Sequence, residues 1–93
     1  MLYFVKVRID AEKLVLYGNQ LQSGLITTHP ISTYCLKDDP AVGLNIWEAD
    51  NLEEFERAFS QHKQFYTDVM EVVPVISAIE AQQVLMAQIT KAV

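Results

Sequence analysis

Four short segments with alternating side chains, separated by segments of helical spacing, are the feature that most constrains how this 93-residue chain folds. Residues 2–9 alternate and are rich in β-branched and aromatic side chains, which is typical of a strand. Residues 31–36, 42–49 and 69–76 are predicted to be strands on the same grounds. The turn-forming residues 37–41 separate two of these segments, so that pair is expected to form a hairpin.

Three further segments carry the 3.6-residue spacing of apolar side chains that predicts a helix. Each begins at a residue type that caps helix N-termini. The first helix is expected to end at Gly24, because glycine is a common C-terminal stop. The predicted caps are Asp10, before a stripe of Leu14, Tyr17 and Leu21; Asp50, before residues 51–66; and Ser77, which forms a Ser-x-x-Glu capping box with Glu80.

The resulting order, β-α-β-β-α-β-α, predicts a single domain over residues 1–93 with a ferredoxin-like α+β fold. Right-handed crossovers convert this order into a four-stranded antiparallel sheet with two helices on one face and an extra C-terminal helix. Pro74 has no backbone N–H to donate, so either the last strand is at an edge of the sheet or Pro74 faces out of the pairing.

The strands are apolar on both faces, whereas two helices cover only one face of such a sheet. We expect Phe4 and Trp47 to lie on the uncovered face, where they would form a large exposed apolar patch. Face-to-face pairing of two sheets into a dimeric α/β barrel buries that patch, and the sequence therefore predicts a homodimer. In the alternative, the third helix folds back over the open face of its own chain.

Charge and composition exclude several classes of partner. The chain has 12 acidic and 7 basic residues and no basic cluster, so neither nucleic acid nor an anionic membrane surface is an expected partner. It has no run of about 18 apolar residues and no signal-peptide layout at its start, and we expect a cytoplasmic protein. The single cysteine, Cys35, is expected to be a buried and inert thiol in a strand.

Several polar and aromatic residues are candidates for a ligand site. Asn45 and Trp47 share one strand face, and we expect Tyr34 or Ser32 and Lys6 or Phe4 to face them from neighbouring strands. Such a wall, apolar with a few polar groups, is typical of a ligand cavity. The alternative is an aromatic dimer core with Lys6 at its rim. The predicted ligand-binding residues are Lys6, Tyr34, Asn45, Trp47, His62 and Tyr66.

The histidines have two interpretations each. His62 lies on or beside the apolar stripe of the second helix, where it is a general base or a metal or haem ligand, or simply packs or stays half-exposed. His29 precedes Pro30 in a connector, at a cavity mouth or in an exposed loop. The two histidines share no spacing typical of metal ligands, so neither a metal nor a cofactor is expected.

Three stretches resemble the dimeric α/β-barrel superfamily, which includes muconolactone isomerase-like proteins and antibiotic-biosynthesis monooxygenases. They are residues 1–5 (MLYFV), residues 43–50 (GLNIWEAD) and residues 72–76 (VVPVI), followed by the Glu80-Ala81 helix. Within that superfamily the chain is most similar to a small family of unassigned role. The resemblance implies a homodimer with a cavity between sheet and helices or inside the barrel.

Enzymes of that superfamily provide two comparisons. Haem-degrading members have a tryptophan and a histidine that Trp47 and His62 match, but the asparagine of their first strand has no counterpart in residues 2–9. Haem degradation is therefore not expected. The leading hypothesis is a homodimer that binds a small, partly apolar ligand or acts as an accessory protein. The alternative is a cofactor-independent monooxygenase or isomerase that uses His62 with Asn45, Trp47 and Tyr34.

Overall fold

The computed structural model describes the backbone of residues 1–92 and the side chains of residues 1–89. The predicted order of strands and helices is confirmed, with boundaries that differ by up to three residues. The elements are β1 (Leu2–Arg8), α1 (Ala11–Ser23), β2 (Ser32–Cys35), β3 (Val42–Glu48), α2 (Leu52–Lys63), β4 (Asp68–Val75) and α3 (Ala78–Ala92).

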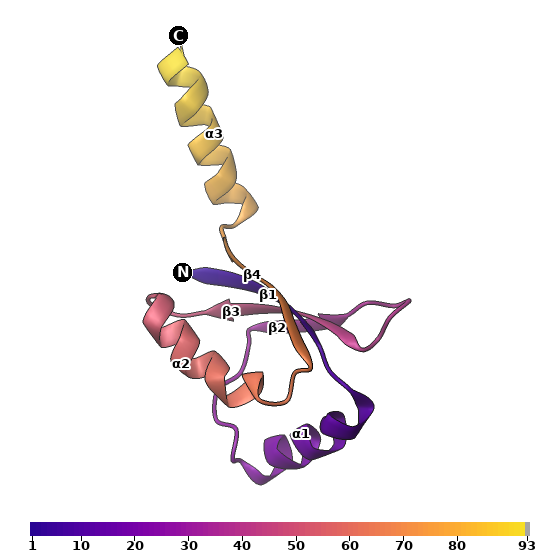
Figure 1. The fold of residues 1–93 in the computed structure, drawn as a ribbon. Helices are drawn as coiled ribbons and strands as arrows, with labels where there is room; N and C mark the ends of the chain where they lie inside the picture. The colour runs from indigo at the N-terminus through magenta and orange to yellow at the C-terminus, as the bar shows by residue number, and fades with distance from the viewer. Residues whose placement is uncertain (93) are drawn as a thin grey trace.

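The four strands form one antiparallel sheet in the order β2-β3-β1-β4, which is the ferredoxin-like arrangement. α1 and α2 lie on one side of this sheet, whereas α3 leaves from the end of β4 and projects away on the other side (Figure 1). β4 pairs only with β1, which confirms the edge position expected from Pro74. No helix in the described residues is long and apolar enough to cross a bilayer.

A cluster of aromatic rings joins α2 to the sheet. Phe55 stacks on Tyr3 of β1 with ring centroids 4.4 Å apart, and on Phe59 with centroids 5.5 Å apart. Trp47 of β3 packs edge-on against both phenylalanines. Phe55 and Phe59 are one helical turn apart, so both rings face the sheet and the core lies under α2.

The helix caps agree with the sequence in part. Gly24 ends α1 in the left-handed conformation, and the Ser77 hydroxyl accepts a hydrogen bond from the Glu80 amide at 3.1 Å, as predicted. Asp10 stands at the N-cap of α1, but its side chain makes no capping hydrogen bond. The prediction that Asp50 caps α2 is wrong by one residue, because the Asn51 side chain accepts the Glu54 amide at 2.9 Å.

The face that α1 and α2 leave uncovered is apolar, but its composition differs from the prediction. Trp47 pairs with Tyr3 on the helix-covered face, whereas Phe4 pairs with Ile46 on the open face. Phe4 and Trp47 therefore lie on opposite faces, because they occupy positions of opposite parity in the pairing register. The apolar side chains of the open face are Leu2, Phe4, Leu44, Ile46, Val73 and Val75, all half-buried.

The alternative in which α3 folds back over this open face is contradicted. From Gln82 to Ile89 every residue of α3 is exposed to solvent, and the helix extends away from the sheet.

Replacing Phe55 by alanine tests the aromatic cluster. Phe55→Ala removes a ring that is 2% exposed and is expected to lower the free energy of unfolding by about 3–5 kcal/mol. Leu52→Ala, at an exposed position of the same helix, is expected to change it by about 0.5 kcal/mol or less. Urea denaturation followed by circular dichroism measures both, and equal losses would contradict the assignment of the core to this cluster.

Candidate functional site

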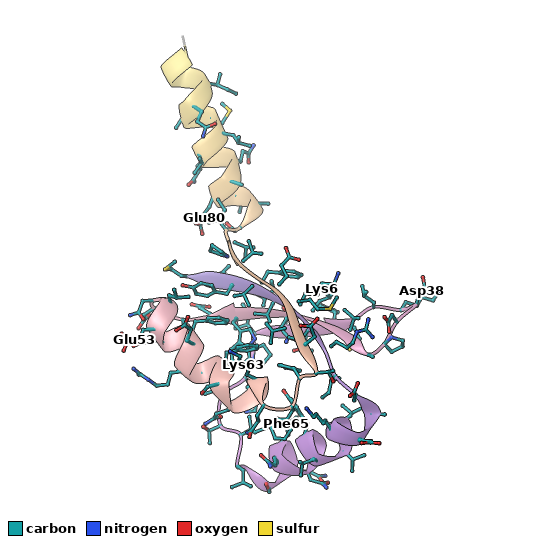
Figure 2. All side chains as sticks on the ribbon, viewed as in Figure 1. Lys6, Asp38, Glu53, Lys63, Phe65 and Glu80 are labelled. Atoms are coloured by element: carbon teal, nitrogen blue, oxygen red, sulfur yellow. The ribbon has the colours of Figure 1, made fainter. Side chains whose placement is uncertain are left out.

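α1 stands away from the sheet that it covers. It has no buried residue, and its predicted stripe of Leu14, Tyr17 and Leu21 faces the sheet across open space instead of packing on it. Tyr17 bridges this space, with its ring 5.1 Å from that of Phe65 and 6.1 Å from that of Tyr66 between ring centroids. Figure 2 shows Phe65 between the end of α2 and α1. One aromatic side chain thus anchors the helix.

Between α1 and the sheet there are two adjoining cavities, with volumes of about 350 and 160 Å³. Both are lined by Tyr17, Thr33, Asn45 and Tyr66. The larger one also contacts His62 and the smaller one reaches the β2–β3 hairpin. The remaining lining residues are Leu21, His29 and Pro30 for the larger cavity, and Val7, Ile9, Leu14, Cys35, Pro40, Ala41 and Gly43 for the smaller one.

The sheet contributes its polar groups to these cavities through one cross-strand row. Val5, Asn45 and Thr33 pair directly across β1, β3 and β2. Side chains of directly paired residues point to the same face of a sheet, so Asn45 and Thr33 both face α1. Asn45 is 3% exposed, and a polar side chain buried to that degree requires a hydrogen-bond partner.

His62 of α2 is 1% exposed and has a partner on each ring nitrogen. Its Nε2 lies 2.6 Å from the carbonyl oxygen of Thr28, and its Nδ1 is hydrogen-bonded to the hydroxyl of Tyr17. Burial lowers the pKa of His62 below its ordinary value, so the imidazole is neutral near pH 7. A neutral ring carries one proton and a carbonyl oxygen only accepts, so Nε2 carries that proton and Nδ1 accepts from Tyr17.

The connector between α1 and β2 is held against α2, which places the Thr28 carbonyl for His62. The Gln61 side-chain oxygen accepts hydrogen bonds from the Thr27 amide at 2.8 Å and the Thr28 amide at 3.1 Å. The Thr28 hydroxyl in turn donates to the Ala58 carbonyl at 2.6 Å. Consecutive turns of α2 thus fix both the connector and the tautomer of His62.

Tyr66 and Asn45 extend the polar side of the cavities beyond His62. The Tyr66 ring lies 6.1 Å from the Tyr17 ring between centroids, and Tyr17, Tyr66 and Asn45 line both cavities together. The Tyr17 hydroxyl links this group to His62 through its hydrogen bond to Nδ1. Burial raises the pKa of both tyrosines, so both hydroxyls stay protonated near neutral pH.

The structure brings together only part of the predicted site. Asn45, His62 and Tyr66 meet at the larger cavity. Lys6 and Tyr34 pair with Leu44 from either side and thus lie on the open face of the sheet, so the prediction that they face Asn45 is wrong. In Figure 2, Lys6 is on the side of the sheet away from α1. The physical reason is again the parity of the strand register.

Trp47 belongs to the core behind the cavity. Its ring stands edge-on to His62 with centroids 4.9 Å apart, and it is absent from the lining of either cavity. Its indole N–H is buried without a hydrogen-bond acceptor among the described residues. Trp47 thus supports the position of His62 by contact.

His29 and Cys35 are the remaining residues with a predicted environment. His29 is exposed and also lines the larger cavity, so it is at once an exposed connector residue and a residue of the cavity mouth. The prediction that Cys35 is buried is wrong. Cys35 is exposed because it lies on the edge strand β2, where α1 does not pack against the sheet. In the described part of the chain, no three His, Cys, Asp or Glu residues group as metal ligands do.

Sequence reasoning missed Tyr17 and Thr33 as site residues. Tyr17 was expected only as part of an apolar stripe, and its hydroxyl was the signal that this stripe meets polar groups. Thr33 follows from the hairpin register, which a turn of uncertain length left open. Comparison of the chain with protein-family models, with curated proteins and with solved structures finds no match.

The state of His62 can be measured directly. Nuclear magnetic resonance of the imidazole nitrogens at pH 7 is expected to show a neutral ring protonated on Nε2. Its pKa lies below the ordinary 6.5, so the unfolded chain binds a proton first as the pH falls. The free energy of unfolding therefore includes a His62 contribution that decreases as the pH falls below 6.5.

The variant His29→Gln assigns the two histidine signals in this titration. His62→Gln is expected to remove the His62 contribution to the pH dependence of stability, whereas His29→Gln retains it. A His62 signal that titrates at or above pH 6.5 would contradict the buried neutral ring.

Proposed function

We propose that this protein is a homodimer that binds a small, uncharged, partly apolar molecule between α1 and the sheet. The single observation that carries the proposal is the unfilled space under α1. Leu14 and Leu21 face that space and remain 55% and 37% exposed, although helix stripes of this kind normally pack on the sheet. A bound apolar group would give these side chains the contacts that the chain itself leaves unmade.

The chemistry of the lining favours an uncharged ligand. All lining residues belong to the described part of the chain, and none of them is Asp, Glu, Lys or Arg. An ion moved into such a cavity would lose its hydration without gaining a counter-charge. Hydroxyl and amide groups of Tyr17, Tyr66, Asn45 and Thr33 instead suit a ligand with one or two hydroxyl or carbonyl oxygens.

The size and layout support the same proposal. A cavity of about 350 Å³ lies within the range of small-molecule sites. The ferredoxin-like sheet with one apolar face left open supports the homodimer and the kinship to the dimeric α/β-barrel superfamily. Because the cavities lie on the opposite face of the sheet, pairing through the open face leaves them accessible.

A pair of tyrosine variants tests the ligand site. A thermal-shift screen of small phenols, quinones and cyclic ketones is expected to identify a ligand that raises the melting temperature. Tyr66→Phe removes one hydrogen bond, worth about 0.5–1.5 kcal/mol. The dissociation constant of that ligand, measured by calorimetry, is therefore expected to rise about 2- to 13-fold. Tyr34→Phe makes the same change on the opposite face and is expected to leave it unchanged. Equal effects would place the ligand elsewhere.

A second function, that of a cofactor-independent monooxygenase or isomerase, is favoured by the hydrogen bond that joins the cavity-lining Tyr17 hydroxyl to the buried His62. Its first step would be removal of a proton from the bound molecule. As the Tyr17 oxygen takes that proton, the Tyr17 proton moves to Nδ1 of His62. The ligand is left as an anion and His62 as the cation, so charge balances. Burial lowers the pKa of His62, which makes the imidazolium a ready proton donor for a later step.

The variant His62→Gln tests this second function. It keeps a polar side chain but removes the base, so turnover of a substrate found by the screen is expected to fall by about 10²- to 10⁴-fold. Tyr34→Phe, on the other face, serves again as the control with unchanged turnover. Full activity of His62→Gln would remove His62 from the mechanism and leave a binding protein.

A further inference from the structure

α3 makes this chain far less compact than its length requires. The radius of gyration is 16.3 Å and the longest extent is 56 Å, whereas a compact chain of this length has a radius of about 12 Å. The excess comes from α3, which projects from the end of β4 (Figure 1). A helix of 15 residues is only marginally stable in water by itself, so α3 requires a surface to pack on.

α3 carries an apolar face for such a contact. Ala81, Leu85 and Ile89 recur every four residues and therefore lie on one side of the helix. Leu85 is 58% exposed and Ile89 is 60% exposed. Gln83 and Ala87 lie on the opposite side, so a contact through the apolar face leaves them in solvent.

The base of α3 and the open face of the sheet form an inside corner. A groove of about 740 Å³ lies where β4 turns into α3. Figure 2 shows Glu80 at this base, where α3 begins. The groove joins the helix to the apolar open face, so the two surfaces are continuous. Its lining residues are Met1, Leu2, Glu48, Pro74, Val75, Ile76 and Glu80.

We propose that the open face and α3 form one L-shaped surface that a second copy of this chain occupies, with α3 of each copy packed against the other. α3 projects on the side where a second sheet would lie, so in a two-fold dimer each α3 runs alongside the partner. Sheets pack about 10 Å apart, and α3 is about 22 Å long. The helix therefore reaches past the partner's sheet. This inference rests on the homodimer proposed above and names its interface.

The area of the surface supports this occupant. A stable interface buries about 800 Å² on each partner. The four strands are seven, four, seven and eight residues long and about 4.8 Å apart, so the open face covers roughly 410 Å². One side of α3 adds roughly 220 Å². The open face alone thus falls well short of a stable interface, and sheet and helix together approach it.

Paired charge substitutions on the two sides of α3 test the inference. Light scattering at micromolar concentration is expected to give wild-type protein at twice the chain mass. Leu85→Asp with Ile89→Asp is expected to halve that mass. Gln83→Asp with Ala87→Asp adds the same charge on the opposite side of the helix and is expected to leave the mass unchanged. Trp47 lies in the aromatic core between the sheet and α2, so its fluorescence checks that each variant remains folded.

A cross-linking measurement on otherwise wild-type protein gives an independent result. A photo-reactive amino acid is placed at position 85 in a mixture of ¹⁴N- and ¹⁵N-labelled chains. Cross-links that join light to heavy chains are expected, whereas cross-links confined to one chain would overturn the inference. A monomeric wild type would overturn both the homodimer and the role of α3. A dimer that survives Leu85→Asp with Ile89→Asp would overturn only the role of α3.

Discussion

One constraint determines the rest of this structure: a four-stranded sheet with apolar side chains on both faces has only α1 and α2 to cover one of them. On the covered face, α2 makes the aromatic core with Tyr3, Phe55 and Phe59. α1 covers the same face without packing on it, so the core ends under α2 and cavities begin under α1. On the other face, Phe4, Ile46 and their neighbours have no covering helix among the described residues, and α3 projects away from them.

The candidate site lies where α1 does not pack on the sheet and where polar side chains line the resulting cavity. His62 terminates the apolar face of α2 at the same point where Tyr17 reaches across from α1. Both ring nitrogens of His62 have a partner, the Tyr17 hydroxyl and the Thr28 carbonyl, so the buried imidazole is satisfied within the chain. A buried polar group with its partners in place costs little, whereas an unpaired one is expensive. Tyr66 and Asn45 line the space beside it together with Tyr17.

Periodicity predicted the fold because strand alternation and helical spacing are local properties that tertiary contacts here reinforce. The order of elements, the edge position of Pro74 and the stop at Gly24 all follow from residue chemistry alone. The face of the sheet on which each side chain lies was harder to predict, because a shift of one residue in strand register moves every side chain to the opposite face. That is why Asn45 lines a cavity, whereas Lys6 and Tyr34, which were expected to face it, lie on the opposite face of the sheet. Cys35 is exposed because α1 does not pack against the sheet, and the local sequence pattern does not predict that separation.

The two unfilled surfaces differ in what can fill them. The space under α1 is small, concave and contains hydrogen-bonding groups, so a small molecule fits it better than another helix does. The open face is broad and continuous with a projecting helix, and the two together approach the area of a stable protein interface. The sheet is shared by both, since Val5 and Phe4 are neighbours in β1 that point in opposite directions. The proposed dimer contact through Phe4 and the proposed ligand cavity therefore rest on opposite faces of one strand, β1.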